Sequence, residues 1–210
     1  GVIQKELGII EQAAMDGGHT IRKIQEFTRK KGDRFQFVPV DVNEIIEGTI
    51  ELMKTKIKDE AEAKGIPIQV QTVKEEVCSV MGNPTELREV FLNILLNSID
   101  AMPKGGTITL KTEKRNGYVS IEVSDNGIGI PGSIKPRIFD PFFTTKGVQR
   151  SGLGLSVSYG IIHRHLGEIQ VESQEGVGTT FRIKLPAAKG ETERREDGEN
   201  SSAIVHYISH

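Results

Sequence analysis

An aspartate and a pair of glycines form the polar stretch of this sequence whose spacing most suggests chemistry. Asp125 ends an alternating, strand-like segment and precedes NGIGIP, which contains Gly127 and Gly129. An ionised carboxylate only accepts hydrogen bonds, so it can accept one from an exocyclic amine such as that of adenine. Glycines lack Cβ atoms and allow the backbone to lie flat against a planar ring. Asp-Asn-Gly is also common turn chemistry, so a simple turn is the alternative.

Two asparagines four residues apart form a second candidate site. Asn93 and Asn97 lie in REVFLNILLNSIDAM, and on a helix this spacing places both on one face. An amide oxygen can complete the coordination of Mg²⁺, a hard cation that prefers oxygen ligands. The alternative is a pair of asparagines that only face solvent. The apolar surface beside them comes from Phe91, Ile94, Leu95 and Ile99.

The third candidate is a basic loop that leads into a glycine-rich helix start. The segment IFDPFFTTKGVQRSGLGLS contains Lys146 and Arg150, and then Gly152 and Gly154. The N-terminus of a helix offers free N–H groups and the positive end of the helix dipole, both of which favour phosphate. Glycines before a helix are also common as simple helix boundaries. The adjoining basic residues favour the phosphate-binding interpretation.

Local patterns between residues 35 and 187 predict the elements that position these residues. Helices are expected after the N-cap Asp41, after Asn83-Pro84 and after GLGL, because Asp and Asn cap helices and proline suits the first turn. Alternation predicts strands in FQFVPV and IPIQVQTV, a hairpin about Asn116-Gly117, and a second hairpin in EIQVESQEGVGTTFRIKLP. The expected fold class is α+β, with helices on one face of a mainly antiparallel mixed sheet.

Two further segments flank this domain. Residues 1–34 repeat apolar positions at heptad spacing, which predicts a helix of a bundle or coiled coil, or a helix that lies on its own domain. Residues 188–210 are rich in charge and are expected to be a flexible tail.

Composition limits the classes of partner. The 210 residues are 36% hydrophobic and 27% charged, as in a soluble globular protein, and the net charge of −2 gives no argument for nucleic-acid binding. Cys78 is the only cysteine, which fits a reducing compartment, so we expect a cytoplasmic protein. No run of 18 apolar residues occurs, so membrane attachment would have to come from parts outside this sequence.

In this order and spacing, the stretches resemble the ATP-binding catalytic domain of sensor histidine kinases of two-component systems. That family is related to gyrase, Hsp90 and MutL. NILLNSIDAM is similar to its N box, DNGIG to its G1 box, FDPFF to its F box and GLGL to its G2 box, within residues 41–186. DPFFTTK followed by GLGLS resembles the branch of the nitrogen-regulation sensor. The resemblance implies a two-layer α/β sandwich of the Bergerat type, preceded by a helix from a dimerisation bundle.

The resemblance also implies ATP and Mg²⁺ as ligands and a role for each matching residue. Asn97 is expected to bind Mg²⁺, and Asn93, with Lys146, is the catalytic candidate that helps place metal and phosphates. Asp125 is expected to bind the amino group of adenine, supported by Thr179. The other expected nucleotide contacts are Gly127, Gly129, Ile130, Phe139, Lys146, Arg150, Gly152, Leu153, Gly154 and Leu155.

A lid over roughly residues 144–151 is expected to cover the phosphates, with Phe139 and Phe142 packed at its base. The family often has a glycine two residues before Gly152, where this chain has Arg150. Arginine reduces backbone freedom and adds a positive charge near the expected γ-phosphate. Arg150 is therefore expected either to assist phosphate binding or to be an exposed lid residue.

The residue at position 93 separates kinases from hydrolases in this comparison. Hydrolases of the gyrase and Hsp90 kind carry a glutamate there that activates water, whereas Asn93 has a carboxamide, which is no general base. We therefore expect a protein-histidine kinase that passes the γ-phosphate of ATP to a histidine on a dimerisation helix, for relay to a response-regulator receiver domain. The full-length protein is expected to be a homodimer.

The position of the acceptor histidine and two other functions complete the expectations. His19 lacks the following acid and the later proline that accompany the family's acceptor, so the acceptor is expected outside this sequence. The alternatives are a serine kinase of the anti-sigma-factor type and a non-catalytic nucleotide-binding signalling module.

Overall fold

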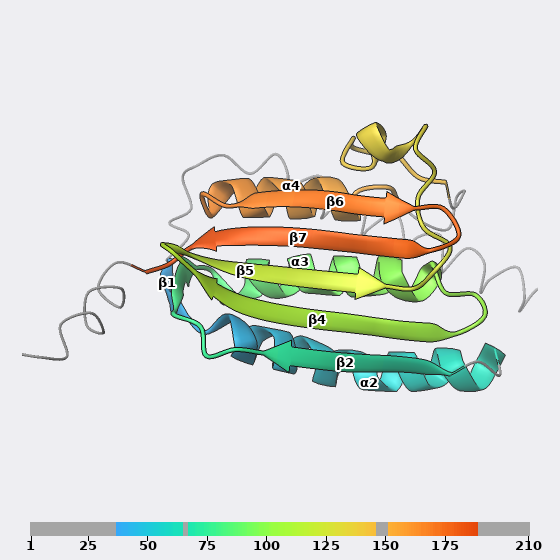
Figure 1. The fold of residues 1–210 in the computed structure, drawn as a ribbon, viewed down its shortest axis with the longest axis horizontal. Helices are drawn as coiled ribbons and strands as arrows, with labels where there is room; N and C mark the ends of the chain where they lie inside the picture. Colours follow the sequence, from blue (N-terminus) through green and yellow to red (C-terminus); the bar gives the residue numbers. More distant parts are fainter. Residues whose placement is uncertain (1–36, 65–66, 146–150, 189–210) are drawn as a thin grey trace, which may run out of the picture.

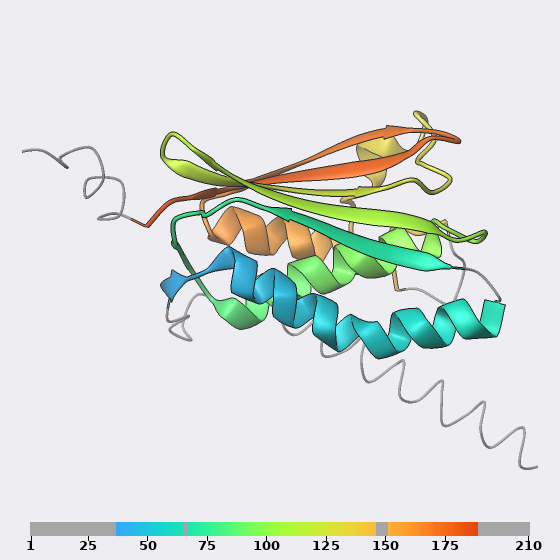
Figure 2. The ribbon, with the colours of Figure 1, turned by 60° about the horizontal axis from the view of Figure 1, so that its bottom comes forward.

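The fold is a two-layer sandwich of a five-stranded sheet and three helices. The computed structural model describes residues 37–64, 67–145 and 151–188. The helices α2 (Val42–Lys64), α3 (Pro84–Asp100) and α4 (Gly154–Arg164) all cover one face of the sheet (Figure 1, Figure 2). The expected helix before residue 35 and almost all of the expected tail lie outside the described residues. None of the helices in the described residues is both long and apolar enough to cross a membrane.

The sheet is mixed, with a single parallel pairing among its named strands. Its order is β2-β4-β5-β7-β6, and only β2 and β4 run parallel. The strands are β2 (Ile68–Lys74), β4 (Gly106–Arg115), β5 (Tyr118–Asp125), β6 (Glu168–Gln174) and β7 (Gly178–Pro186). The predicted fold class and both predicted hairpins are therefore confirmed.

Alternation along β5 shows how the sheet separates its two faces. Val119, Ile121 and Val123 are buried under the helices, and Asp125 continues this inner row at the end of the strand. Successive side chains of a strand point to opposite faces, so Asp125 faces the helix layer rather than solvent. The carboxylate predicted as a ligand group is thus placed by the same pattern that builds the core.

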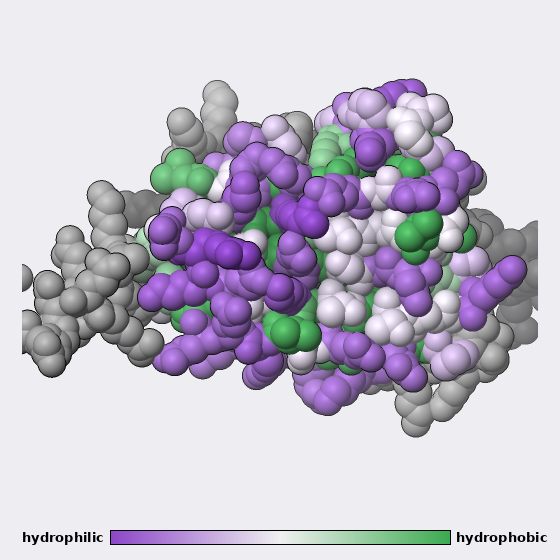
Figure 3. All heavy atoms as spheres, viewed as in Figure 1, coloured by the Kyte–Doolittle hydropathy of each residue, from purple (hydrophilic) through white to green (hydrophobic). Residues whose placement is uncertain are grey.

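The outer face of the sheet is hydrophilic (Figure 3). Glu122 on β5 lies opposite Arg182 on β7, and the Arg182 guanidinium also pairs with Glu172 on β6. These exposed pairs contribute little stability individually, because water and salt screen them. The stability of the domain comes instead from the apolar layer between sheet and helices.

The helix α3 is the central helix of that layer. Asn83 caps it by accepting hydrogen bonds from the backbone N–H groups of Thr85 and Glu86, and Pro84 occupies its first position, as predicted. Phe91 and Ile94 on this helix are fully buried. The strong local signals at its start explain why it could be predicted from the sequence.

The expected strand FQFVPV forms only in part. Its last three residues form β1 (Val38–Val40), which pairs antiparallel with β3 (Val80–Gly82) in a separate two-stranded sheet. The sequence analysis did not predict β3, because three residues are too few for an alternating pattern. The two short strands join the entry into the domain to the start of α3.

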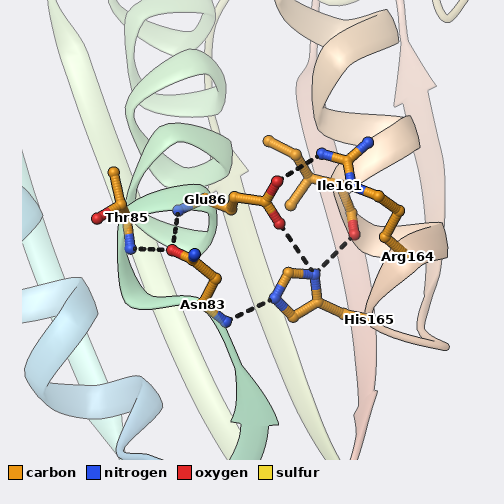
Figure 4. A network of polar contacts seen from close by, with 6 residues as sticks. All are labelled: Asn83, Thr85, Glu86, Ile161, Arg164 and His165. Carbon is orange, nitrogen blue, oxygen red and sulfur yellow. Dashed lines mark hydrogen bonds and ion pairs between the residues drawn. The ribbon is translucent and has the colours of Figure 1, made fainter. Parts of the chain in front are cut away.

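A buried histidine connects the ends of two helices next to this small sheet (Figure 4). His165 follows α4, and its Nε2 accepts a hydrogen bond from the backbone N–H of Asn83 at 3.0 Å, while its Nδ1 is 2.8 Å from the carbonyl oxygen of Ile161. Accepting at Nε2 and donating from Nδ1 requires a neutral ring. The ring of Phe37 stacks on a face of the imidazole, with the two ring centroids 4.5 Å apart. The imidazole thereby holds the start of α3, the end of α4 and the entry of the chain together.

Burial lowers the pKa of His165 below the ordinary value for histidine, although the bond to Ile161 and the nearby Glu86 carboxylate act in the opposite direction. Glu86 itself forms an ion pair with Arg164 at 2.7 Å. The unfolded chain binds a proton on this histidine more readily than the folded chain does. The contribution of His165 to the free energy of unfolding is therefore fully present above about pH 6.5 and is lost as the pH falls through the folded pKa.

We expect His165→Phe to reduce both the stability of the domain and its dependence on pH. At pH 7.5 the free energy of unfolding should fall by about 1–3 kcal/mol, because the part-buried N–H of Asn83 loses its acceptor. Between pH 7.5 and 5.5 the variant should lose less stability than the parent chain. Urea titrations across this range measure both effects.

The matched control is His163→Gln, which removes an exposed histidine of the same helix that contacts only the Tyr159 ring among the described aromatic contacts. It should retain the parent's pH profile. If the stability of the His165→Phe variant depended on pH as that of the parent does, the proposed role of His165 in the pH dependence would be wrong.

Candidate functional site

Asp125 is the centre of the candidate site. Its side chain is buried, with 9% of the residue exposed, and both carboxylate oxygens accept hydrogen bonds from the protein. Oδ1 accepts from the backbone N–H of Gly127 at 3.0 Å, and Oδ2 accepts from the Ser98 hydroxyl of α3 at 3.0 Å. Burial of an ionised carboxylate is costly unless donors of this kind surround it. The end of β5 is thus joined to α3 and to the loop of residues 126–131.

The β6–β7 hairpin closes one side of this site. Thr179 lies opposite Asp125 in the register of β5 and β7 and is buried. Its Oγ1 is 3.0 Å from the hydroxyl oxygen of Ser173, which donates to the carbonyl of Gly178 and accepts from the N–H of Ile130 at 2.8 Å. These contacts fix the far end of the 126–131 loop to the hairpin.

Both glycines of this loop are required by the protein's own backbone. A Cβ at Gly127 would lie 2.4 Å from the carbonyl oxygen of Ala101. Gly129 has φ +69°, and its Cβ would lie 2.1 Å from the carbonyl oxygen of Gln174. Their missing side chains let the loop pass between the end of α3 and the hairpin, a reason for the glycines that the sequence did not show. The expectation that they also make room for a planar ring stays a prediction.

The two asparagines of α3 lie on one face of the helix, as predicted. Asn93 is buried, and its Nδ2 donates to the carbonyl of Gly154 at 3.1 Å and to the hydroxyl of Ser158 at 3.3 Å. Asn97 is half-buried, and its Nδ2 donates to the backbone carbonyl of Asn93 at 2.9 Å. Asn93 thereby attaches α3 to the first turn of α4, a contact that the sequence did not predict.

The start of α4 is held by close backbone contacts. Gly152 has φ +66°, and a Cβ there would lie 2.5 Å from the carbonyl carbon of Phe142. Leu153 is buried and Leu155 is half-buried, both against the core. A Cβ at Gly154 would lie 3.3 Å from Oδ1 of Asn93. The glycine-rich turn therefore lies beside the asparagine face of α3.

The expected packing of the phenylalanines is wrong for Phe142. Its residue is 61% exposed with φ +65°, a left-handed conformation that places the backbone against Gly152 while the side chain is exposed. Phe143 packs against the core instead, with the Arg137 guanidinium 4.6 Å above its ring. Phe139 is half-buried and contacts the ring of Tyr159.

Lys146 and Arg150, with most of the expected lid, lie outside the described residues. Their expected contacts with phosphate stay predictions. The structure thus brings together Asp125 and Thr179 at the end of the sheet, and Asn93 and Gly154 between α3 and α4, with Asn97 on the same helix face.

The sequence analysis missed Ser98 and Ser173. Ser98 occupies the buried apolar stripe of α3, at helical spacing from Phe91, Ile94 and Leu95. A hydroxyl in an apolar stripe needs a hydrogen-bond partner, and this signal could have identified it. Ser173 gave no comparable signal, because its contacts depend on how the hairpin meets the 126–131 loop.

Comparisons with known proteins agree with this geometry. Residues 82–189 match the model of the family described as histidine kinase-, DNA gyrase B-, and HSP90-like ATPase. The chain belongs to this family. It is 40% identical over 158 residues to sporulation kinase E of Bacillus subtilis (strain 168), covering 74% of this chain and 20% of that protein. It is 33% identical over 187 residues to the signal transduction histidine-protein kinase AtoS of Escherichia coli (strain K12), covering 87% of this chain and 29% of that protein.

Solved structures of the family show the same fold. The catalytic domain of histidine kinase ThkA is 32% identical with a TM-score of 0.62, covering 72% of this chain and 95% of that chain. The complex of ThkA with the response regulator protein TrrA is 26% identical with a TM-score of 0.70, covering 89% of this chain and 52% of that chain. The predicted ATP-binding catalytic domain of a sensor histidine kinase is thus confirmed, whereas the nitrogen-regulation branch stays a prediction. The chain spans between 20% and 35% of the length of the first curated relatives it matches.

We expect Gly129→Ala to destabilise the domain by at least about 1 kcal/mol, because the new Cβ meets the Gln174 carbonyl and the backbone is in the left-handed region. Gly132→Ala is the control, since a Cβ there has nothing within 4 Å, and it should change stability by less than about 0.5 kcal/mol. Urea unfolding measures both variants. Equal stability of the two variants would show that the loop does not depend on this close approach.

Proposed function

We propose that the domain binds ATP with Mg²⁺ between the end of β5, the asparagine face of α3 and the start of α4. The observation that carries this proposal is the buried Asp125 carboxylate, held by Ser98 and Gly127 at the edge of the helix layer. A carboxylate fixed in this way accepts a hydrogen bond from the 6-amino group of adenine. Thr179, Gly127, Gly129 and Ile130 then lie beside the base.

The proposed phosphate site is the N-terminal turn of α4. Gly152, Leu153, Gly154 and Leu155 present backbone N–H groups and the positive end of the helix dipole. Lys146 and Arg150, from the preceding loop, supply positive charge for the phosphates in this proposal, and Phe139 supports the base of the lid.

Asn97 is the proposed Mg²⁺ ligand. The Nδ2 of its carboxamide donates to its own helix, so the atom suited to a cation is the amide oxygen. Mg²⁺ usually takes few protein ligands and completes its shell with water and phosphate oxygens, so one amide oxygen fits. Bound Mg²⁺ neutralises charge on the phosphates. Asn93, next to the first turn of α4, helps to position this region.

The proposed reaction is phosphoryl transfer to a histidine rather than to water. Asn93 stands where a hydrolase needs a base, and its amide donates to Gly154 and Ser158. Phosphoryl transfer then depends on an acceptor placed in line with the γ-phosphate. A serine kinase of the anti-sigma-factor type and a non-catalytic binding module are the alternative functions.

The proposed partners are a dimerisation helix that carries the acceptor histidine and a response-regulator receiver domain. The similarity to ThkA in complex with the response regulator TrrA supports this proposal. We further propose that the full-length protein is a homodimer and that this domain works in the cytoplasm, where ATP is available.

Asp125→Asn should weaken ATP binding by about tenfold or more, because a hydrogen bond to a charged group is worth roughly 1.5–3 kcal/mol. Isothermal titration calorimetry with MgATP measures the effect. The matched control is Asp41→Asn, which makes the same chemical change at the distant N-cap of α2. Unchanged affinity in the Asp125 variant would exclude the proposed adenine site.

The 210-residue chain should bind ATP but phosphorylate itself very weakly, because His19 lacks the acid that would orient its ring. It should instead label a separate fragment that contains an acceptor helix. Incubation with radiolabelled ATP tests both statements. Strong acid-labile labelling of this chain alone, abolished by His19→Gln, would make His19 the acceptor.

A further inference from the structure

Ser98 contacts Asp125 from a position that solvent and ligands do not reach. The residue is 1% exposed, and its Oγ lies 3.0 Å from Oδ2 of Asp125. A carboxylate oxygen only accepts, so the serine hydroxyl is the donor in this contact. Asp125 is the more exposed of the two residues, at 9%. Any effect of Ser98 on a bound base must therefore pass through Asp125.

Hydrogen bonds reach the two carboxylate oxygens of Asp125 from different parts of the fold. Oδ1 is held by the backbone of Gly127 in the 126–131 loop, and Oδ2 is held by Ser98 on α3. Attachment at both oxygens restricts rotation about the Cβ–Cγ bond and so orients the plane of the carboxylate. The orientation of the acceptor is thus set before any base arrives.

We propose that Ser98 is a positioning residue that sets the selectivity of this site for the 6-amino group of adenine. The inference rests on the proposed function, in which Asp125 receives that amine. A hydrogen bond to a charged acceptor depends on direction as well as distance. A fixed carboxylate therefore raises the affinity for a base that carries the amine. A base that lacks the amine gains nothing from the orientation.

A purely structural role for Ser98 makes a different prediction. If the hydroxyl only joins α3 to β5, its removal lowers stability and weakens every nucleotide to a similar degree. If it positions the carboxylate, the loss falls on bases that carry the amine. The ratio of two affinities therefore separates the roles even when the variant is less stable.

The experiment uses Ser98→Ala in the 210-residue chain with two probes, MgATP and the magnesium complex of purine riboside triphosphate, which lacks only the 6-amino group. Calorimetry should show ATP binding weakened by about threefold to tenfold, with the other probe changed by less than about twofold. Ser98→Thr, which retains the hydroxyl, should restore most of the preference for ATP.

The matched control is Thr49→Val, which removes a fully buried hydroxyl of α2 that bonds only to the carbonyl of Ile45 among the described contacts. It should leave the ratio of the two affinities unchanged. If Ser98→Ala weakened the binding of both nucleotides equally, so that the ratio of their affinities stayed that of the parent, the inference would be overturned.

Asp125→Asn measured with the same probes distinguishes the two levels of the argument. If it removes the preference for ATP while Ser98→Ala retains it, the inference fails and the proposed adenine site stands. If Asp125→Asn leaves the preference unchanged, the proposed site fails and the inference with it.

Discussion

The constraint on which the site depends is the burial of a carboxylate at the inner edge of the sheet. Asp125 continues the row of Val119, Ile121 and Val123, so the register of β5 forces it towards the helix layer. A carboxylate in that place is shielded from water and needs hydrogen-bond donors from the protein. The fold meets this need by ending α3 next to the strand and by leading the chain back through the 126–131 loop.

The arrangement of α3 and α4 follows from attachments at both ends. At the start of α4, the first turn accepts a hydrogen bond from Asn93 in the middle of α3. At the end of α4, His165 bonds to the N-cap of α3, and Arg164 pairs with Glu86. Two attachments along a pair of short helices restrict sliding and rotation between them. The glycine-rich start of α4 and the asparagine face of α3 therefore keep a fixed relation.

Local signals made most of the fold predictable. Asn83-Pro84 started α3 where expected, and Asn116-Gly117 formed the hairpin turn. The parts that could not be predicted depend on contacts between distant segments: the pairing of β1 with β3, and the meeting of the 126–131 loop with the β6–β7 hairpin. For the site, residue types indicated Asp125, but the reason for its glycine neighbours required the backbone positions of Ala101 and Gln174.

The chemistry of position 93 and the architecture of the domain are coupled through one side chain. A glutamate there could serve as a base, but its carboxylate has no N–H and would face the carbonyl oxygen of Gly154, which now accepts from Asn93. Two acceptors in a buried contact repel each other, and the attachment of α4 to α3 would be lost. Asparagine therefore fixes the start of α4, and in the proposed function it also supplies no base for water. In the proposed function, the side chain that positions the glycine-rich turn therefore also disfavours hydrolysis.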